Sequence, residues 1–359
     1  MPKRKTNLDP DFAAALDNMR KGDDVLSMAT LFTLSDVTRP ELEKFAETWA
    51  ALPVARRRQV ALALRDLAEE SIEADFNRLF RHLMEDEDAE VREHALDGLW
   101  EDEDLTLINP LIGAMRSDAA ARVRAAAAES LGRFVLLSET KRIPADRGER
   151  VTEALLAVVR NPAEDPLVRR RAIESIAYLG NDLVRNIIAS AYADDDALMR
   201  ATALFAMGRS ADPYWRRTLA QELYSSDPQL RYEAARAVGE LEYKAVVPRL
   251  IELLEDADRE VQLAAITSLG QIGGKEAKQT LIDILEGEDE AAREIAQDAL
   301  DELEFNSGSE MLLYDMGLSD QEDLQLESEL LGEDWDLYKE EKLDLDDDEL
   351  GEKKEEEEE

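Results

Sequence analysis

Apolar and polar positions along this chain recur with a long, fixed period. Between residues 165 and 303 an Asp is followed after four positions by an Arg, once by a Gln, and after three more positions by an Ala. The pattern repeats at an unchanging step, with the Arg or Gln at Arg169, Arg200, Arg231, Gln262 and Arg293. Around each of these residues the apolar and small positions fall on one side of a helix. A fixed period of about 20 to 50 residues is typical of solenoids, in which each unit buries its apolar face on its neighbours.

Residue types within each period also predict where the helices begin, pack and end. The Asp four positions before each Arg is the expected N-cap, because its side chain accepts hydrogen bonds from the N–H groups of the first turn. Small residues at fixed positions allow neighbouring helices to approach closely. The most regular of them are Ala95, Ala127, Ala172, Ala203, Ala234, Ala265 and Ala296. A Gly eight positions after the Arg is expected to end the helix. These glycines are Gly132, Gly208, Gly239 and Gly270.

The series Asp, three residues, Arg, two residues, Ala, and then a small residue, an apolar residue and Gly resembles the HEAT repeat. In particular it is similar to the short HEAT-like repeats of phycobilisome lyase subunits. The resemblance extends over residues 41 to 305 and implies an all-α solenoid of about eight helical hairpins. It also implies a ladder in which each Arg meets Asp carboxylates of its own or the neighbouring repeat. Gln262 departs from the pattern at an Arg position, and Ala120 departs from it at an Asp position.

The regions beside the regular repeats suggest how the chain is divided. Residues 1–38 are expected to form an N-terminal helical cap over the first repeat, and residues 39–305 to form the solenoid. The interval from Arg124 to Arg169 is almost half as long again as the interval from Arg169 to Arg200. This surplus predicts an insertion loop at 138–150, which is either a contact site or a passive surface loop. Its basic residues are Lys141, Arg142, Arg147 and Arg150.

Residues 306–359 differ abruptly in composition, with 23 acidic and 4 basic residues. After a linker at 306–309 they are expected to form a disordered acidic tail, since like charges repel and apolar residues are few. The aromatic residues of this tail are Tyr314, Trp335 and Tyr338. Aromatic residues between acidic ones are typical of segments that bind a partner groove, and a tail that only increases solubility is the other interpretation. One hypothesis is that the tail folds back on the repeats and competes with an external partner.

Composition disfavours several kinds of chemistry. The chain has no Cys and two His, so a thiolate nucleophile or a site rich in Cys or His is not expected. The HEAT-repeat enzyme deoxyhypusine hydroxylase would require several His-Glu pairs, whereas this chain has one reversed pair, Glu93 with His94. We therefore predict no catalytic residue, no cofactor and no metal.

Charge and hydropathy limit the kinds of partner in the same way. A net charge of −40 disfavours nucleic acid, because phosphate binding needs a concentrated positive surface. No window approaches the roughly 18 apolar residues of a membrane span, and no secretory signal precedes the repeats. The expectation is a soluble cytoplasmic protein without membrane contact.

Helix positions opposite the buried stripe form the candidate binding surface. In HEAT-type arrays the second helix of each hairpin lines the concave face, as the resemblance implies. Residues one and five positions after each Arg lie there, and they include aromatic, aliphatic and basic side chains of the kinds enriched in interfaces. The partner-binding candidates are Arg170, Phe205, Tyr232, Arg236 and Leu263. The same rows also contain Glu174 and Ala201.

Together these observations predict a non-enzymatic protein-interaction scaffold or adaptor that binds a protein partner on the concave face. The acidic chain and the apolar candidates favour a partner with basic and apolar surface. The alternative is a phycobilin-lyase-like or other chromophore-handling enzyme subunit, since those lyase subunits share the repeat and act through a bilin-binding cavity.

Overall fold

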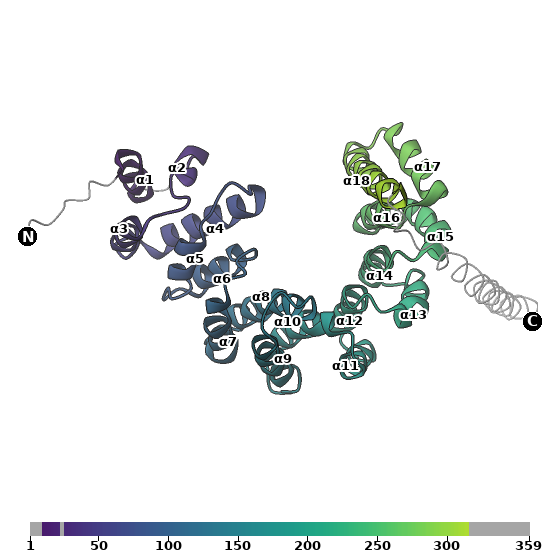
Figure 1. Ribbon diagram of the computed structural model, residues 1–359, viewed down its shortest axis with the longest axis horizontal. Coiled ribbons are helices and arrows are strands. Elements are labelled where there is room, and N and C mark those ends of the chain that lie inside the picture. The colour runs from purple at the N-terminus through teal and green to yellow at the C-terminus, as the bar shows by residue number, and fades with distance from the viewer. Residues whose placement is uncertain (1–8, 22–24, 316–359) are drawn as a thin grey trace, which may run out of the picture. The chain divides into compact units, whose positions relative to one another are not determined.

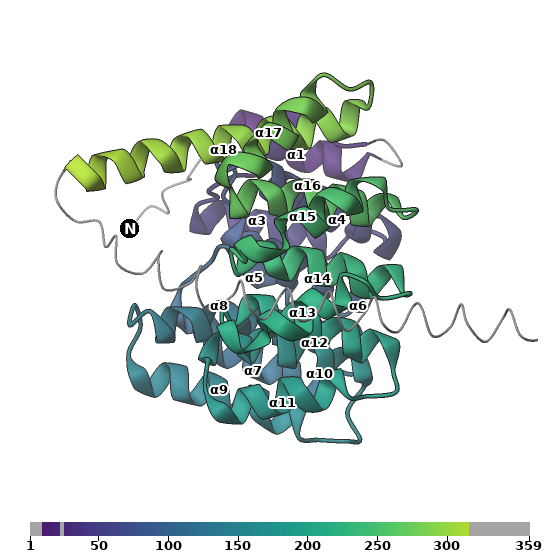
Figure 2. The same ribbon diagram turned by 90° about the vertical axis from the view of Figure 1, so that its right-hand side faces the viewer.

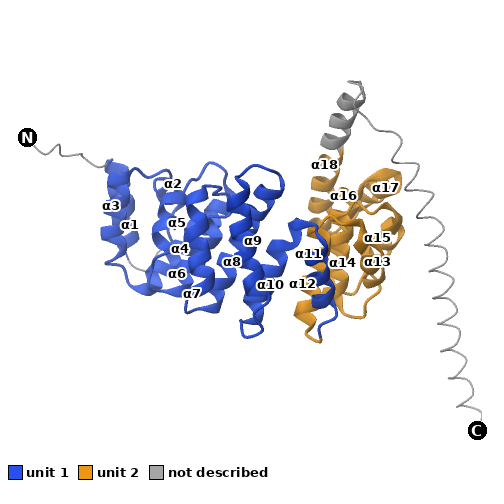
Figure 3. Cartoon of the chain, turned by 60° about the horizontal axis from the view of Figure 1, so that its bottom comes forward, with its two compact units in different colours: residues 1–194 blue, residues 195–359 orange. Residues whose placement is uncertain are grey.

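The computed structural model describes residues 9–21 and 25–315, with side chains up to Leu303. Within these residues the chain forms α-helices and short 3-10 turns, and no strand. It divides into two compact units, residues 1–194 and 195–359 (Figure 3). Trp335 and Tyr338 lie outside the described residues, as does the side chain of Tyr314.

The first unit is built from helices that pack in successive pairs. These helices are α1 (Pro10–Arg20), α2 (Met28–Phe32), α3 (Arg39–Trp49), α4 (Val54–Glu70), α5 (Asn77–Leu83), α6 (Ala89–Gly98), α7 (Ile108–Ser117), α8 (Ala121–Glu139), α9 (Ala145–Val159), α10 (Pro166–Ile176) and α11 (Asp182–Tyr192). The second helices α4, α6, α8 and α10 pack on one another in a row, and α5, α7 and α9 pack against that row (Figure 1). At the N-terminal end, where we predict a cap, α1 contacts α3 and α2 contacts α4.

The second unit repeats the same arrangement. Its helices are α12 (Ala197–Arg209), α13 (Arg216–Glu222), α14 (Pro228–Glu240), α15 (Val247–Glu252), α16 (Arg259–Ile272), α17 (Gly274–Leu285) and α18 (Glu290–Asp315). The second helices α12, α14, α16 and α18 form the row, and α13, α15 and α17 pack against it. Figure 2 shows α18 extending well beyond α16 and α17. Because α18 continues to Asp315, the linker predicted at 306–309 is wrong, and those residues belong to a helix.

Helix starts follow the sequence pattern. The side chain of Asp227 accepts a hydrogen bond from the Gln229 N–H at 3.0 Å, and Pro228 occupies the first turn of α14. Asp258 caps α16 through the N–H groups of Glu260 and Val261. The other second helices that begin at a capping Asp do so at Asp88, Asp165 and Asp196. The predicted N-caps are therefore confirmed.

Close packing between successive second helices depends on the small residues. The seven Ala residues three positions after the repeat Arg have 0% exposed surface, which confirms the predicted register. The glycines eight positions after the Arg do not end helices by a left-handed turn, because none of the four has a positive φ. A Cβ on Gly208 would lie 2.8 Å from the Cα of Ala237, in the next repeat. These glycines are needed because a neighbouring helix comes too close for a side chain.

The predicted insertion at 138–150 is not a loop. The helices α8 and α9 take up the surplus, since they have 19 and 15 residues, and only residues 140–144 connect them. Lys141 has φ 58°, and its N–H donates to the Ser138 carbonyl at 3.0 Å. The next N–H, of Arg142, donates to the Leu137 carbonyl at 2.8 Å, which completes a Schellman motif at the end of α8.

Candidate protein-interaction site

Three of the repeat arginines, Arg92, Arg124 and Arg231, pair with carboxylates within the array. Arg231 donates two hydrogen bonds to Asp256, from Nε and Nη2, each at 2.7 Å, and Nη1 donates to the Ser225 carbonyl at 2.8 Å. Arg92 holds Asp118 through the same two atoms, each at 2.8 Å. The hydrogen bonds from Arg231 keep the pKa of Asp256 below its ordinary value. Because these side chains are paired and mostly buried, we exclude them from the candidate site.

The acceptors of Arg92 and Arg231 in this ladder are Asp residues of the neighbouring repeat, as the resemblance implies, but they are not the Asp residues that cap the second helices. Asp256 lies six positions before Gln262, and Asp118 lies six positions before Arg124. The Asp residues four positions before each Arg are used as N-caps instead. The acceptor carboxylate also accepts a hydrogen bond from its own turn. For Asp256 the donor is the Asp258 N–H, at 2.8 Å. This local bond holds the carboxylate in the orientation in which the Arg of the neighbouring repeat binds it.

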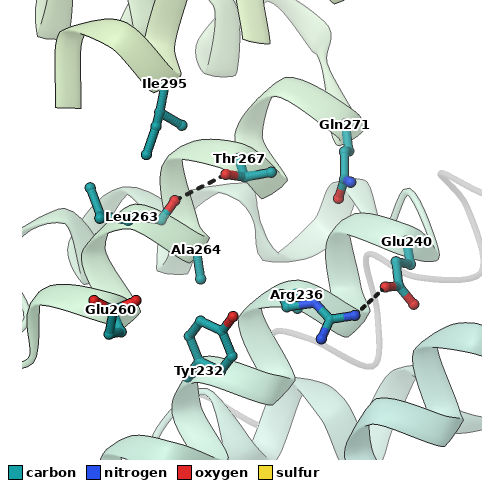
Figure 4. Close-up of a pocket in the computed structure, with 9 residues that line it drawn as sticks. All are labelled: Tyr232, Arg236, Glu240, Glu260, Leu263, Ala264, Thr267, Gln271 and Ile295. Carbon is teal, nitrogen blue, oxygen red and sulfur yellow. Dashed lines mark hydrogen bonds and ion pairs between the residues drawn. The ribbon is translucent and has the colours of Figure 1, made fainter. Parts of the chain in front are cut away.

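One groove in the second unit gathers three of the predicted binding residues. We call it the α14–α16 groove. It has a volume of about 330 Å³ and is lined by Tyr232, Arg236, Glu240, Glu260, Leu263, Ala264, Thr267, Gln271 and Ile295. Tyr232 points into it from α14, and Ile295 points toward the same space from α18 (Figure 4). Leu263 lies between them on α16, so the centre of the groove is apolar.

Charge around the groove is unevenly paired. Arg236 donates to Glu240 at 2.7 Å and to Glu233 at 3.3 Å. Burial lowers the pKa of Arg236, but the hydrogen bond to Glu240 and the two carboxylate charges outweigh it and raise the pKa overall. Three exposed carboxylates on α16 and α18 have no cation partner among the described residues. They are Glu260, which lines the groove, and Glu294 and Asp298, which lie one position before and three positions after Ile295 on α18.

Phe205 lies beside this groove but is covered. The guanidinium of Arg209 lies 4.3 Å from the centre of its ring, and that of Arg236 lies 4.6 Å from it. Such cation–π contacts fix the ring between α12 and α14. Phe205 therefore supports Arg236 and is not itself an open anchor for a partner.

Other residues of the predicted rows are placed differently. Arg170 is half-buried on α10 of the first unit and does not belong to the groove. Ala201 and Glu174, which the rows place on the exposed face, are buried with 4% and 8% exposed surface. Glu174 accepts a hydrogen bond from Arg171 at 2.7 Å. Ala201 and Glu174 are buried because successive second helices approach each other closely and cover the edges of the face that these residues share.

The four predicted basic residues are spread over the connection at 140–144 and the first turns of α9. Arg142 donates to Glu103 at 2.7 Å, and Arg147 lies 3.6 Å from Asp146. Lys141 and Arg150 are exposed. With two of its four members facing carboxylates, this set is not a concentrated basic surface.

Two segments of the chain match a known repeat family. The family model described as HEAT repeats matches residues 76–145 and 216–301. These two segments are HEAT repeats. No protein with a curated description matches the sequence.

Several solved structures are similar at low sequence identity. The YibA protein of E. coli is 20% identical, with a TM-score of 0.39, over 67% of this chain and 96% of that protein. The CpcE and CpcF complex of phycocyanin lyase from Nostoc sp. PCC7120 is 19% identical, with a TM-score of 0.39, over 54% and 75% of the two chains. Human deoxyhypusine hydroxylase is 18% identical, with a TM-score of 0.32, over 74% and 96%.

The second HEAT segment contains the whole α14–α16 groove. The first contains a feature that the sequence did not reveal, a group of carboxylates around Asp97 on α6. Burial, followed by the charges of Glu93 and Glu129, raises the pKa of Asp97 to about 7. The signal in the sequence was the acidic pair one and five positions after Arg92, but burial decides its effect.

Among the residues that the structure describes, no three His, Asp or Glu side chains are arranged to hold a metal ion. No described helix is both long enough and apolar enough to cross a membrane.

Proposed function

We propose that this HEAT-repeat protein is a non-enzymatic scaffold or adaptor that holds a protein partner in the α14–α16 groove. The observation that supports this proposal is the groove itself, in which Tyr232, Leu263 and Ile295 surround an apolar centre on the row of second helices. Aromatic and aliphatic side chains in a concave, partly desolvated position are the usual centres of binding energy in protein interfaces.

The charge around the groove supports a partner with basic and apolar surface. Glu260, Glu294 and Asp298 are exposed and have no cation partner among the described residues. The whole chain has a net charge of −40, which accelerates the approach of a basic partner and repels acidic ones. An apolar anchor with Lys or Arg beside it satisfies both features of the groove.

A capture experiment with a matched pair of variants tests this proposal. Leu263→Asp places a charge in the centre of the groove, whereas Ile282→Asp places the same charge on α17, where Ile282 is 38% exposed and outside the groove. Tagged wild type and both variants are compared in the cells from which the protein comes. We expect a protein that is enriched with wild type and Ile282→Asp and reduced at least tenfold with Leu263→Asp, since an unsolvated charge opposite an apolar anchor costs more than about 1.4 kcal/mol.

Two results would contradict the proposal. One is that every captured protein is retained equally by both variants, which would place the partner elsewhere on the chain. The other is purified protein that carries a bilin chromophore, seen by its visible absorbance and lost with Leu263→Asp, which would favour the chromophore-handling alternative. Circular dichroism of the two variants serves as the control for folding.

A further inference from the structure

A short stretch of the acidic C-terminal region differs from the sequence around it. Residues 335–343 contain three acidic and two basic residues, and they hold both aromatic residues of the segment 316–359, Trp335 and Tyr338. Directly before this stretch, the segment 320–334 contains seven acidic and no basic residues. Residues 344–352 contain six acidic and no basic residues. A nearly neutral aromatic stretch therefore interrupts a strongly acidic one.

The chemistry of this stretch matches the α14–α16 groove. Trp335, Tyr338, Lys339 and Lys342 have the spacing i, i+3, i+4, i+7 in the sequence. Residues with this spacing share one face whenever a segment binds as a helix. The two aromatic rings suit the apolar centre of the groove. The two lysines suit Glu260 in the groove and the exposed carboxylates of Glu294 and Asp298 near Ile295 on α18, none of which has a cation partner among the described residues. The acidic residues on either side of the stretch fit neither feature, because like charges repel.

The length of the chain allows this contact. The helix α18 lines the groove through Ile295 and ends at Asp315 in the same unit, about 30 Å further along at 1.5 Å per residue. The segment 316–334 then connects the end of α18 to Trp335. A flexible chain of that length has a root-mean-square span of about 25 Å and a fully extended span of about 63 Å. The return distance along α18 lies between these two values.

We propose that residues 335–343 occupy the α14–α16 groove of their own chain when no partner is bound. This inference rests on the proposed function, since it takes the groove as the partner's site and makes the segment a competitor for it. A segment tethered at this distance has an effective concentration on the order of 1 mM, so contacts too weak to matter between separate molecules are sufficient.

Fluorine NMR of the full chain tests the proposal without any partner. Replacing the four tryptophans by 5-fluorotryptophan gives four resonances, and Trp335→Phe identifies the one from Trp335. Its reference position comes from a synthetic peptide of residues 330–347 that carries the same label. Trp215, which is 3% exposed in the second unit, reports in the same spectrum whether that unit remains folded.

Two matched pairs of variants decide the outcome. The Trp335 resonance should be displaced from the peptide position in wild type and should return to it in Leu263→Asp and in the double variant Lys339→Glu, Lys342→Glu. It should stay displaced in Ile282→Asp and in the double variant Lys353→Glu, Lys354→Glu, which has the same change in charge. If Leu263→Asp moves the Trp215 resonance, the lysine variants decide alone, because they leave the groove unchanged.

A wild-type resonance at the peptide position would overturn the proposal, and so would a displaced resonance that no variant returns. Failure of the proposed function is distinguishable from either result. If Leu263→Asp abolishes partner capture while Trp335 gives the peptide position, only the self-docking is wrong. If Trp335 docks as expected while partner capture is unaffected by Leu263→Asp, only the partner site is wrong.

Discussion

Residues at the same position of the repeat have different electrostatic surroundings in the two units. Asp97 and Arg236 each lie five positions after a repeat Arg. Burial lowers the pKa of Arg236, but the carboxylates of Glu240 and Glu233 outweigh it and raise the pKa overall. Asp97 is largely removed from water and faces the carboxylates of Glu93 and Glu129, so its neutral form is favoured. The position in the repeat thus determines the helix face on which a side chain lies, while the neighbouring side chains determine the direction in which its pKa is shifted.

The pKa of Asp97 gives a pH-dependent prediction at this scale. Its value of about 7 in the folded state exceeds that of an unfolded chain, about 3.9, so its favourable contribution is complete below about pH 4 and is lost as the pH rises to about 7. Asp97→Asn should therefore raise the free energy of unfolding by about 1–2 kcal/mol at pH 8, discounted for partial exposure, and leave it unchanged at pH 4.

Urea unfolding of the wild type and of Asp97→Asn, each at pH 4 and pH 8, measures the change in the free energy of unfolding. Asp298→Asn, which removes an exposed carboxylate of the second unit, is the control and should show no comparable gain at pH 8. An equal gain for Asp97→Asn at pH 4 and pH 8 would mean that the amide packs better, and that titration is not the cause.

At the scale of helices, periodic features were predictable and helix lengths were not. The Ala row was found because close packing requires a small residue in every repeat, and its burial is confirmed. The surplus between Arg124 and Arg169 was assigned to a loop, although it lengthens α8 and α9 instead. This surplus corresponds to about four helical turns, so it extends two helices without changing the register of either buried face.

The roles of the repeat glycines and serines were also not predictable from the sequence pattern. A Gly near a helix end is consistent with a left-handed turn or with a close neighbour, and the sequence does not separate these. At Gly239 the neighbour is Ser268, whose Oγ donates to the Ala235 carbonyl of the preceding repeat at 2.7 Å. The same bond joins Ser175 to the Ala128 carbonyl at 2.9 Å. These hydrogen bonds depend on how two neighbouring helices pack, which the sequence pattern does not specify.

The arginine ladder gives a prediction at this scale. Arg231→Gln, which introduces the residue found at Gln262, should lower the free energy of unfolding by about 2–4 kcal/mol, because Asp256 is left buried without its guanidinium. Adding Asp256→Asn should recover part of the loss, since the unpaired charge is then removed. The pKa of Asp256 is lowered by Arg231, so the loss should shrink as the pH falls below about 4.

Arg259→Gln is the matched control for the ladder. Arg259 pairs with Asp289, and their side chains are 42% and 48% exposed. Its loss should cost less than about 1 kcal/mol. Equal costs for Arg231→Gln and Arg259→Gln in urea unfolding would show that burial of the ladder does not strengthen it.

For the whole molecule, the candidate site was predictable in part. Three residues of the predicted rows, Tyr232, Arg236 and Leu263, line one groove, and their role in binding stays a prediction. The rows missed Ile295, which completes the groove from the next repeat, and the sequence did not show that Phe205 is covered by two guanidiniums. Both depend on which side chains from neighbouring helices reach the same space, and a one-dimensional pattern does not contain that information.

Competition between the tail and a partner gives the prediction for the whole chain. In the full-length protein, the double variant Lys339→Glu, Lys342→Glu should bind the partner that Leu263→Asp loses with about 2- to 10-fold higher affinity, because a groove occupied half to nine-tenths of the time becomes available. The double variant Lys353→Glu, Lys354→Glu has the same charge and should show only the general attraction for a basic partner, which about 0.5 M salt suppresses. The difference between the two double variants, measured by titration at about 0.15 M and about 0.5 M salt, isolates the competition. Weaker binding by the first double variant would instead mean that its lysines contact the partner, so that the tail extends the binding site.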